Sequence, residues 1–527
     1  MKPLRALYWI ALGWFFSFFF FLILVPLLHI LAQVTQWRMI FDPAILAIVK
    51  ITVYQATVST AFSLGFGIPL GIWVGRIAAN DSRGHTKWIR GFLSVPFGVP
   101  TLVAATAWVL LLGRSGYLAQ LGIRADFLYS FRAVVLAHTI FNIPWVAFLV
   151  SQSSERISDQ AWEAASTLGA NLGKRLRYVA LPAIWPAIIS AASQVFAFCM
   201  MSFILVMILG GGPPIQTLET SIYTNIRYGH LDLSQAIACA VWELVLTLGP
   251  WVIYVALKNG EKLPDFKSQR AKRYSKFSFY GALGVSVLLC APYFSVLMRE
   301  SNRLLWSGKL LAEISHPLIL SIKIALLSGL GALSFALAAC FLSASSRTRF
   351  TQNLFSWVAI LPTGISVLVL GLGTWLAYGE WIDPFEGSLS AIIAIQSALF
   401  SPVAFRVLWP ILNLYHPAPL EAATTLGAST LRAFYYVEWP RWRQPIVSAF
   451  AVVAGASLGE VAAVSLFYNE NLIPLPLLIS RKLSQYQFEE AQAVSACLLV
   501  ISSFIIFWAS TRGNAVGRRL FYGITTK

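Results

Sequence analysis

The sequence predicts an all-α integral membrane protein with about twelve transmembrane helices, arranged as two parallel repeats of six. Of its 527 residues, 57% are hydrophobic and only 12% are charged, whereas soluble domains have about 45–50% apolar and about 25% charged residues. The apolar residues form runs long enough to cross a bilayer, and the two halves of the chain carry matching motifs. The surplus of apolar side chains must therefore face lipid or the interior of a helical bundle.

A spanning helix needs about 20 mostly apolar residues. Backbone groups in lipid must be hydrogen-bonded internally, so each run is expected to be a helix, or a broken helix that lines a cavity. The first run is too long for a signal peptide and has no small-residue cleavage site nearby, so we expect it to be the first span. The expected spans are residues 8–31, 52–75, 91–113, 132–151, 187–209, 234–257, 277–298, 318–344, 354–377, 388–411, 445–467 and 491–510.

The formal net charge of +17 comes from basic residues that gather between the apolar runs. With both chain ends placed inside, 27 of the 39 Lys and Arg residues fall on the inner side, seven of them in the connector 258–276. Cytoplasmic loops of membrane proteins carry such an excess of Lys and Arg. We therefore expect both termini in the cytoplasm, membrane lipid as the surroundings and no nucleic-acid partner.

The two halves of the chain are related by an internal repeat. Glu163 and Glu421 begin similar stretches 258 residues apart, and Pro144 matches Pro402 at the same offset. Six spans return the chain to the side from which it started, so the halves are expected to be parallel repeats. The expected domains are a first half at 1–257, a basic cytoplasmic linker at 258–276 and a second half at 277–527.

The repeated stretch reads "EAASTLGANLGKRLRYVALP" from Glu163 and "EAATTLGASTLRAFYYVEWP" from Glu421. Each copy lies between the fourth and fifth spans of its half, in the cytoplasm. Ala, Leu and Glu favour helix, and Gly is common just past a helix end. The small alanines would let a partner surface approach the backbone closely. One copy alone could be an ordinary capped loop, but two copies with equal Glu-to-Pro spacing favour partner docking.

These residues resemble the EAA signature of permeases of binding-protein-dependent ABC importers, and the resemblance covers almost the whole chain. In that family the loop forms a coupling helix that docks into a groove on the ATPase subunit. The resemblance implies the type I ABC importer permease architecture. The matching residues are Glu163, Ala164, Ala165, Gly169, Leu181 and Pro182 in the first copy, and Glu421, Ala422, Ala423, Gly427 and Pro440 in the second, where Trp439 replaces the usual Leu.

The fused double arrangement is similar to the thiamine and ferric-iron importer group, as are "LGGGPPIQTLETSIY" and "ASLGEVAAVSLF" after and within the fifth spans. The resemblance implies a permease of the bacterial cytoplasmic membrane with an extracytoplasmic substrate-binding protein and two copies of a cytoplasmic ATPase. The cargo stays open between thiamine, ferric iron and another small solute. No cofactor or metal is expected on this chain, and ATP-Mg is expected on the ATPase.

The chain is not expected to be an enzyme. Its closest approach to a phosphate-binding loop is "GANLGKR", whose spacing is one residue short and in which Arg175 replaces the required Ser or Thr. The hydrolysis of ATP must then occur on a separate subunit.

Glu460 is the sharpest candidate for the substrate pathway, because an acid at the centre of a spanning helix costs about 2.5–3.5 kcal/mol. It should face a cavity or a partner, and it would suit a cationic cargo. A structural hydrogen bond to a neighbouring helix explains it equally well. Ser202 is its counterpart at the 258-residue offset, and Glu243 in the sixth span is a weaker candidate. His138 is expected to be a hydrogen-bonded packing residue.

Two other functions fit a twelve-span protein. An ion-coupled secondary transporter with six-plus-six helices needs no ATPase, but it needs ionisable residues inside several spans, and these are scarce here. A membrane scaffold or assembly protein would move no solute.

Overall fold

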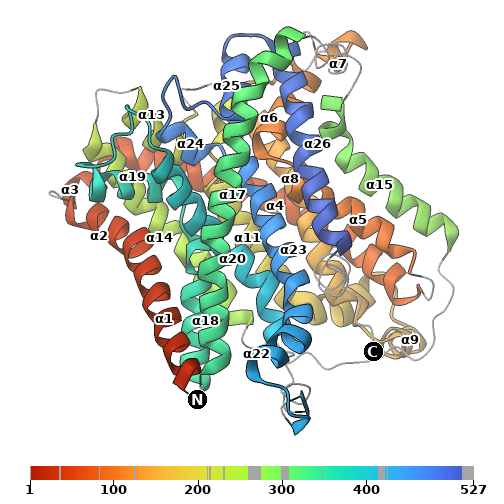
Figure 1. Cartoon of the computed structure of the whole chain (residues 1–527). Helices are drawn as coiled ribbons and strands as arrows, with labels where there is room; N and C mark the ends of the chain where they lie inside the picture. Colours follow the sequence, from red (N-terminus) through yellow and green to blue (C-terminus); the bar gives the residue numbers. More distant parts are fainter. Residues whose placement is uncertain are drawn as a thin grey trace. The chain divides into compact units, whose positions relative to one another are not determined.

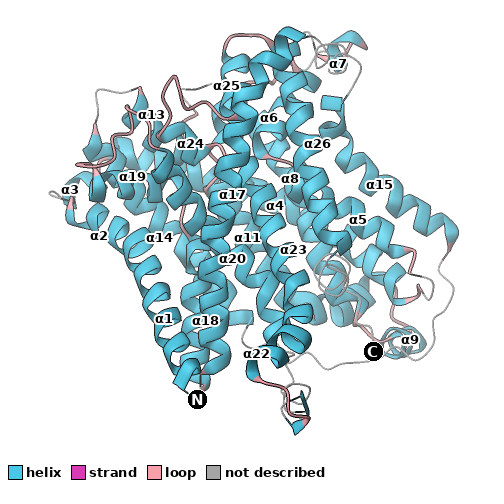
Figure 2. Cartoon of the chain, viewed as in Figure 1, coloured by secondary structure: helices cyan, strands magenta, loops and turns pink. Residues whose placement is uncertain are grey.

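The computed structural model describes residues 2–34, 37–81, 84–114, 116–123, 126–210, 212, 215–228, 232–258, 275–297, 308–346, 348–413, 422–423 and 425–512. Within these ranges the chain consists of helices joined by loops and turns (Figure 1). No strand occurs among the described residues (Figure 2). The expected all-α fold class is therefore confirmed.

The chain divides into two compact units. We call Gln36–Asn302 the N-unit, and Met1–Thr35 together with Arg303–Lys527 the C-unit. The N-unit thus contains the first membrane helix of the second half, and the C-unit contains the first membrane helix of the first half. The division predicted at 258–276 follows the internal repeat, whereas the compact units follow packing, and the two differ by this exchange.

The N-unit contains the membrane helices of the first half after its first span, and the first helix of the second half. Its helices are α3 (Trp37–Ile40), α4 (Pro43–Ala79), α5 (Thr86–Gly98), α6 (Thr101–Leu112), α7 (Tyr117–Gln120), α8 (Phe131–Glu155), α9 (Asp159–Thr167), α10 (Leu172–Arg175), η2 (Leu176–Ala180), α11 (Leu181–Met200), α12 (Ile204–Leu209), α13 (Leu218–Arg227), α14 (Leu233–Lys258), α15 (Lys276–Phe294) and η3 (Ser295–Leu297).

The C-unit begins with the N-terminal helices of the chain and continues with the rest of the second half. Its helices are α1 (Lys2–Phe19), η1 (Phe20–Leu24), α2 (Val25–Ala32), α17 (Gly308–Ser345), α18 (Arg349–Ile360), η4 (Leu361–Gly364), α19 (Val367–Tyr378), α20 (Leu389–Asn413), α22 (Thr430–Ala433), η5 (Phe434–Glu438), α23 (Trp439–Leu458), α24 (Ala462–Leu466), α25 (Leu475–Ser484) and α26 (Phe488–Arg512).

Specific contacts hold each exchanged helix in its unit. In the C-unit, the buried ring of Phe15 on α1 stacks on Phe335 of α17 with the ring centroids 4.9 Å apart. In the N-unit, the indole nitrogen of Trp73 on α4 donates to Ser278 Oγ of α15 at 2.8 Å. A Cβ atom at Gly281 of α15 would lie 3.1 Å from the same indole. Both exchanged helices are thus packed closely against helices of the other half.

Among the described residues, ten helices are long and apolar enough to cross a membrane, or eleven if the bent pair of α18 and α19 counts as one span. Eleven of the twelve predicted segments overlap these helices. The exception is the segment predicted at 445–467, where the structure has α23, a break at 459–461 and the short α24. Of the two forms expected for each run, a helix or a broken helix, this segment is a broken helix, because α23 starts with the polar stretch "WPRWRQP" and ends at Leu458.

The third and fifth spans are broken in both halves. In the third spans, α5 and α6 are separated at 99–100, and α18 with η4 meets α19 at an angle of 99°. In the fifth spans, α11 and α12 are separated at 201–203, and α23 and α24 at 459–461. Non-helical backbone at membrane depth is tolerated only where it is buried in protein or lines a water-filled cavity. Each of the four breaks is therefore expected to be buried in protein or to line such a cavity.

The long helix α4 is fixed on α8 by glycines. A Cβ atom at Gly71 would lie 2.7 Å from Val150 Cβ, and one at Gly75 would lie 2.7 Å from the Ser151 carbonyl oxygen. Small residues four apart allow such close approach of membrane helices. Any side chain at these two positions would push α4 away from α8.

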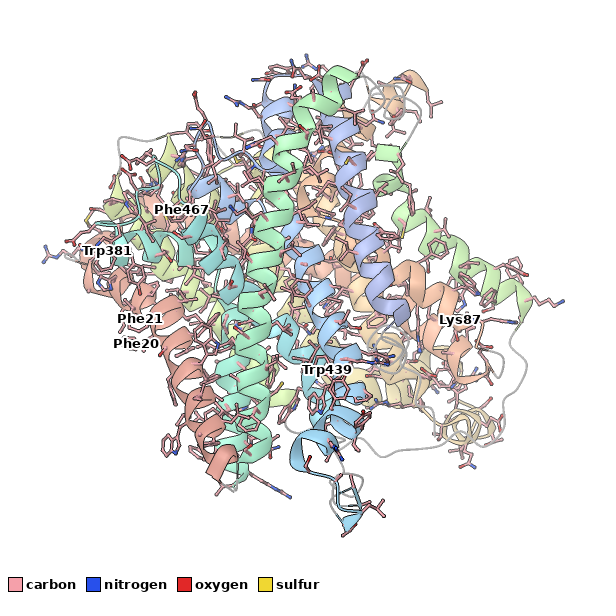
Figure 3. All side chains as sticks on the ribbon, in the orientation of Figure 1. Phe20, Phe21, Lys87, Trp381, Trp439 and Phe467 are labelled. Atoms are coloured by element: carbon pink, nitrogen blue, oxygen red, sulfur yellow. The ribbon has the colours of Figure 1, made fainter. Side chains whose placement is uncertain are left out.

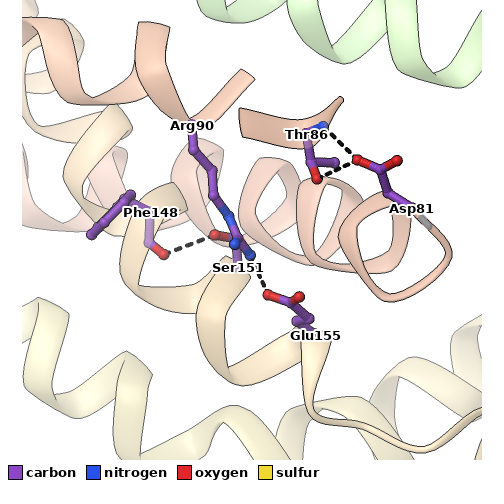
Figure 4. Close-up of polar contacts among 6 residues, drawn as sticks. All are labelled: Asp81, Thr86, Arg90, Phe148, Ser151 and Glu155. Carbon is purple, nitrogen blue, oxygen red and sulfur yellow. Dashed lines mark hydrogen bonds and ion pairs between the residues drawn. The ribbon is translucent and has the colours of Figure 1, made fainter. Parts of the chain in front are cut away.

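An ion pair joins α5 to the end of α8 in the N-unit (Figure 4). The guanidinium of Arg90, which is only 5% exposed, donates to the carboxylate of Glu155. At the start of α5, Asp81 Oδ2 accepts from the backbone nitrogen of Thr86 at 2.6 Å and from its hydroxyl at 2.7 Å (Figure 4). These contacts fix the connection between α4 and α5.

In the C-unit, a buried lysine holds α25 against α17 and α26. The Lys482 ammonium lies 2.7 Å from Glu313 Oε1 and 2.5 Å from Glu490 Oε2. Burial lowers the pKa of Lys482, but its hydrogen bonds to the two carboxylates, and their charge, hold the pKa above its usual value. The lysine is therefore charged at neutral pH and locks α25 in place.

Candidate functional site: two coupling loops and two broken spans

The first repeated motif forms the helix α9 with defined ends. Ser158 Oγ accepts from the backbone nitrogen of Ala161 at 3.2 Å and caps its start. After the last turn, Gly169 takes a left-handed conformation with φ +77°. The backbone nitrogen of Ala170 then donates to the Ala165 carbonyl at 3.0 Å, which closes the helix end. A side chain at Gly169 would meet no atom within 4 Å, so only backbone strain selects glycine there.

The second copy repeats this closure. Gly427 has φ +81°, and the backbone nitrogen of Ala428 donates to the Ala423 carbonyl at 3.0 Å. The Thr425 hydroxyl donates to the Ala422 carbonyl at 2.8 Å, as the equivalent threonine of α9 does to Ala164. Glu421 lies outside the described residues. The glycine stop that the sequence predicts is thus present in both loops.

The outer face of each loop carries small and exposed residues. Glu163 and Ala164 are exposed, and Ala165 is half-buried. Directly before each glycine stands a leucine that sequence reasoning missed: Leu168 is 86% exposed and Leu426 is 88% exposed. The two leucines are 258 residues apart, so the repeat offset was the signal that would have found them. Each loop therefore presents an exposed leucine directly before its glycine.

Each loop enters its fifth span through a π-helical turn. The two turns are η2 and η5, each five residues long, and they start 258 residues apart. Single π-helical turns inside α-helices are often found at functional sites. The local backbone of both loops is thus repeated from the glycine to the membrane helix.

Within each unit, the loop that carries the repeated motif lies at one end and the helix after the fifth span lies at the other (Figure 1). In the N-unit these are α9 and α13, and in the C-unit they are α22 and α25. Figure 3 shows Trp439 toward the coupling-loop end of the C-unit, and Trp381 toward the other end. Exposed tryptophans at two levels are typical of the two membrane interfaces.

Ser202 lies in the break of the fifth span in the N-unit, where it takes part in a polar chain. Its Oγ is 2.7 Å from Nε2 of the buried His138, whose Nδ1 is 2.6 Å from the Gln55 amide nitrogen. Both ring nitrogens of His138 therefore have hydrogen-bond partners, as expected of a packing histidine. The chain links α4 and α8 to the break.

Glu460 lies in the equivalent break of the C-unit. Its Oε1 accepts from the backbone nitrogen of Ala462 at 2.7 Å and so caps the start of α24. Nearby, Gln396 of α20 accepts from the Ser457 hydroxyl at 2.5 Å. The structural hydrogen bond of Glu460 is thus made to its own short helix rather than to a neighbouring helix. A capping carboxylate of this kind explains how the break holds its shape.

Glu243 lies on α14 and not in a break. Its side chain is fully buried, and neither carboxylate oxygen has a hydrogen-bond partner within the described part of the chain. Glu219 of α13 is the neighbouring charge. The structure therefore groups Ser202 and Glu460 as equivalent positions and separates Glu243 from them. In the described ranges, no group of three or more His, Cys, Asp and Glu side chains is placed to hold a metal ion.

Two stretches of the chain, residues 67–257 and 333–521, match the family described as "Binding-protein-dependent transport system inner membrane component". The chain belongs to this family. One match falls in each half, so the chain is a fused double permease of an inner membrane, and ATPase activity in such importers resides in separate subunits. Because the chain belongs to this family of importers, the alternatives of an ion-coupled secondary transporter and a membrane scaffold are set aside.

Three relatives that match along most of the chain bear the name "Thiamine transport system permease protein ThiP". The Brucella abortus (strain 2308) protein is 27% identical over 480 residues, which cover 88% of this chain and 86% of that protein. The Haemophilus influenzae protein is 28% identical over 499 residues, or 91% of each chain. The Escherichia coli (strain K12) protein is 24% identical over 490 residues, covering 90% of this chain and 89% of its own.

Proposed function

We propose that this chain forms the translocation pathway of an ATP-driven thiamine importer. The observation that carries the proposal is the likeness to thiamine permeases across both halves, together with a coupling loop of the same backbone geometry in each half. Ferric iron has less support, because the relatives named above are thiamine permeases. Thiamine carries a fixed positive charge, which suits a pathway that contains a carboxylate.

The two coupling loops each bind one copy of a cytoplasmic ATPase, which holds ATP-Mg. The exposed Leu168 and Leu426 are suited to enter an apolar pocket on that partner, and the exposed Ala164 and Ala422 let its surface approach the helix backbone. Glu163 is the fifth residue of α9, beyond its first turn, and its side chain is exposed on the proposed docking face. Docking of this kind explains why both loops keep the same closed helix end.

Both termini lie in the cytoplasm, and the substrate-binding protein docks on the opposite face. The support is the excess of Lys and Arg in the coupling loops and the connector 258–276. The end of each unit that carries α13 or α25 then faces the binding protein.

Transport follows from two states of the complex. ATP draws the two ATPase copies together, and each copy moves one coupling loop. The π-helical turns η2 and η5 connect these loops to the fifth spans, whose breaks hold Ser202 and Glu460. Movement of the loops therefore shifts the fifth spans, which carry the candidate pathway residues. Glu460 contributes a negative charge near the cation, and hydrolysis returns the pathway to its inward state.

The cargo is tested by the ATPase activity of the reconstituted complex. We expect binding protein loaded with thiamine to raise the rate of ATP hydrolysis, and binding protein loaded with ferric ion to leave it unchanged. Stimulation by the ferric-loaded protein alone would overturn the thiamine assignment while leaving the importer itself in place. Absence of any ATPase bound to the purified permease would overturn the docking assignment.

A further inference from the structure

The first coupling helix has an attachment that the EAA motif does not explain. The guanidinium carbon of Arg76 lies 4.8 Å from the centroid of the Trp162 ring, and that of Arg175 lies 5.5 Å from it. We call Arg76, Trp162 and Arg175 the Trp162 cluster. Its members come from three elements, since Arg76 lies in the last turn of α4, Trp162 lies in α9 and Arg175 ends α10. The cluster therefore joins the coupling helix to a membrane helix.

Trp162 occupies the inner side of the coupling helix. Its side chain is half-buried, whereas the next two residues, Glu163 and Ala164, are exposed. An arginine over the face of tryptophan is attracted by the ring quadrupole, and the attraction grows when the pair is partly removed from water. The side of α9 that faces the protein is thus fixed by the cluster, and the side that faces the ATPase stays free of it.

Arg76, the member of the Trp162 cluster on α4, lies where α4 packs closely on α8. Arg76 follows Gly75, where α4 approaches the Ser151 carbonyl of α8 too closely for any side chain. Ser154, on the last turn of α8, packs on the same glycine. A displacement of α9 that is passed to Arg76 therefore reaches α4 and α8 together.

The second half has other residue types at the positions equivalent to Trp162 and Arg175. At the 258-residue offset, Trp162 is replaced by Leu420 and Arg175 by Ala433. Neither residue type can form a cation–π contact, and Ala433 is buried at 1% exposure. The closed helix end is therefore present in both loops, whereas the residue types of the Trp162 cluster occur at these positions in the first loop.

We propose that Trp162 is a positioning residue that ties the first coupling helix to α4, so that the two coupling loops contribute unequally to transport. The inference rests on the proposed docking of the ATPase on α9. Movement of the ATPase at the first loop is passed to the membrane helices through the Trp162 cluster, in addition to the covalent connections that both loops have. The second loop does not have the residue types for this cluster at the equivalent positions.

The test compares three variants in the complete complex of permease, ATPase and binding protein in proteoliposomes. Trp162→Leu introduces the residue type of the second half, and Trp162→Phe keeps an aromatic face. Trp88→Leu is the matched control, because among the described residues the cation–π partner of Trp88 is its neighbour Lys87 on the same helix. The measurements are the uptake of labelled thiamine and the hydrolysis of ATP, taken as uptake per ATP.

We expect Trp162→Leu to lower uptake per ATP about tenfold while the ATPase stays bound, and Trp162→Phe to lower it less than about threefold. Trp88→Leu should leave the ratio unchanged. An unchanged ratio in Trp162→Leu, an equal fall in Trp88→Leu, or loss of the bound ATPase from Trp162→Leu would overturn the inference.

Hydrogen exchange of the α9 amides provides a second measurement that needs no cargo. We expect exchange in residues 159–167 to be about tenfold faster in Trp162→Leu than in the unmodified permease, with no change in the second loop. Unchanged exchange in α9 would contradict the inference. Failure of the proposed function is separate, because it would appear as no ATP-dependent uptake of thiamine by the unmodified complex.

Discussion

The closed ends of the coupling helices allow a test in which backbone conformation alone is changed. Gly169 and Gly427 have φ +77° and +81°, and a Cβ atom at either position would have no neighbour within 4 Å. A substitution therefore adds no clash. It adds only the cost of a left-handed residue with a side chain, about 1–2 kcal/mol. That cost opens the helix end and displaces the leucine beside it.

The magnitude follows for the pair of loops. If each loop loses about 1–2 kcal/mol of docking free energy, ATPase binding weakens about 5- to 30-fold per loop. The two glycines lie in different units, so the effects of Gly169→Val and Gly427→Val should add. The double variant should then bind the two ATPase copies together about 30- to 900-fold more weakly. Asparagine tolerates the left-handed region better than other side chains, so Gly169→Asn should fall between glycine and valine.

The assay is titration of the ATPase onto the purified permease in lipid nanodiscs. Gly122→Val is the matched control, because Gly122 has φ +80° and open space around its Cβ but lies in a loop after α7, outside both coupling loops. It should leave ATPase affinity unchanged. If the double variant binds the ATPase as tightly as the unmodified chain, the docking role of the two helix ends is refuted.

Three further outcomes are expected. Replacing the exposed Leu168 and Leu426 with Asp should reduce ATPase binding by about 10-fold or more without lowering thermal stability, since neither side chain is packed; a fall in stability instead would show that the leucines are structural. Glu155→Ala should lower the free energy of unfolding by about 2–3 kcal/mol in detergent, because it removes the carboxylate to which the buried Arg90 donates. Glu155→Gln should cost less, and equal losses would argue against the ion pair. Tyr486 has φ +59°, so Tyr486→Gly should be more stable than Tyr486→Ala by about 1 kcal/mol in thermal unfolding; equal stability of the two variants would contradict the backbone strain.

The coupling loops were the most predictable part of the chain, because their geometry depends on local residues. The helix that starts near Glu163 and stops at Gly169 follows from helix propensity and from the one residue type that adopts positive φ without strain. The exposed Leu168 could also have been inferred, since it stands beside that glycine in both copies.

The breaks in the third and fifth spans were not predicted, because average hydropathy reports how apolar a run is and not whether its helix is continuous. At Glu460 the acid was recognised as exceptional, but its action as a cap for α24 depends on where α23 ends. The exchange of first helices was also missed. It depends on long-range packing, such as Phe15 against Phe335, that no local pattern in the sequence encodes.

We propose that this chain moves thiamine across a membrane when a separate ATPase acts on its coupling loops. The most direct measurement is uptake of labelled thiamine into proteoliposomes that contain the permease and its ATPase, with binding protein on one side and ATP on the other. We predict uptake that requires ATP and binding protein and is abolished in the Gly169→Val, Gly427→Val double variant. Uptake that continues without ATP, or that is unchanged in the double variant, would contradict the account.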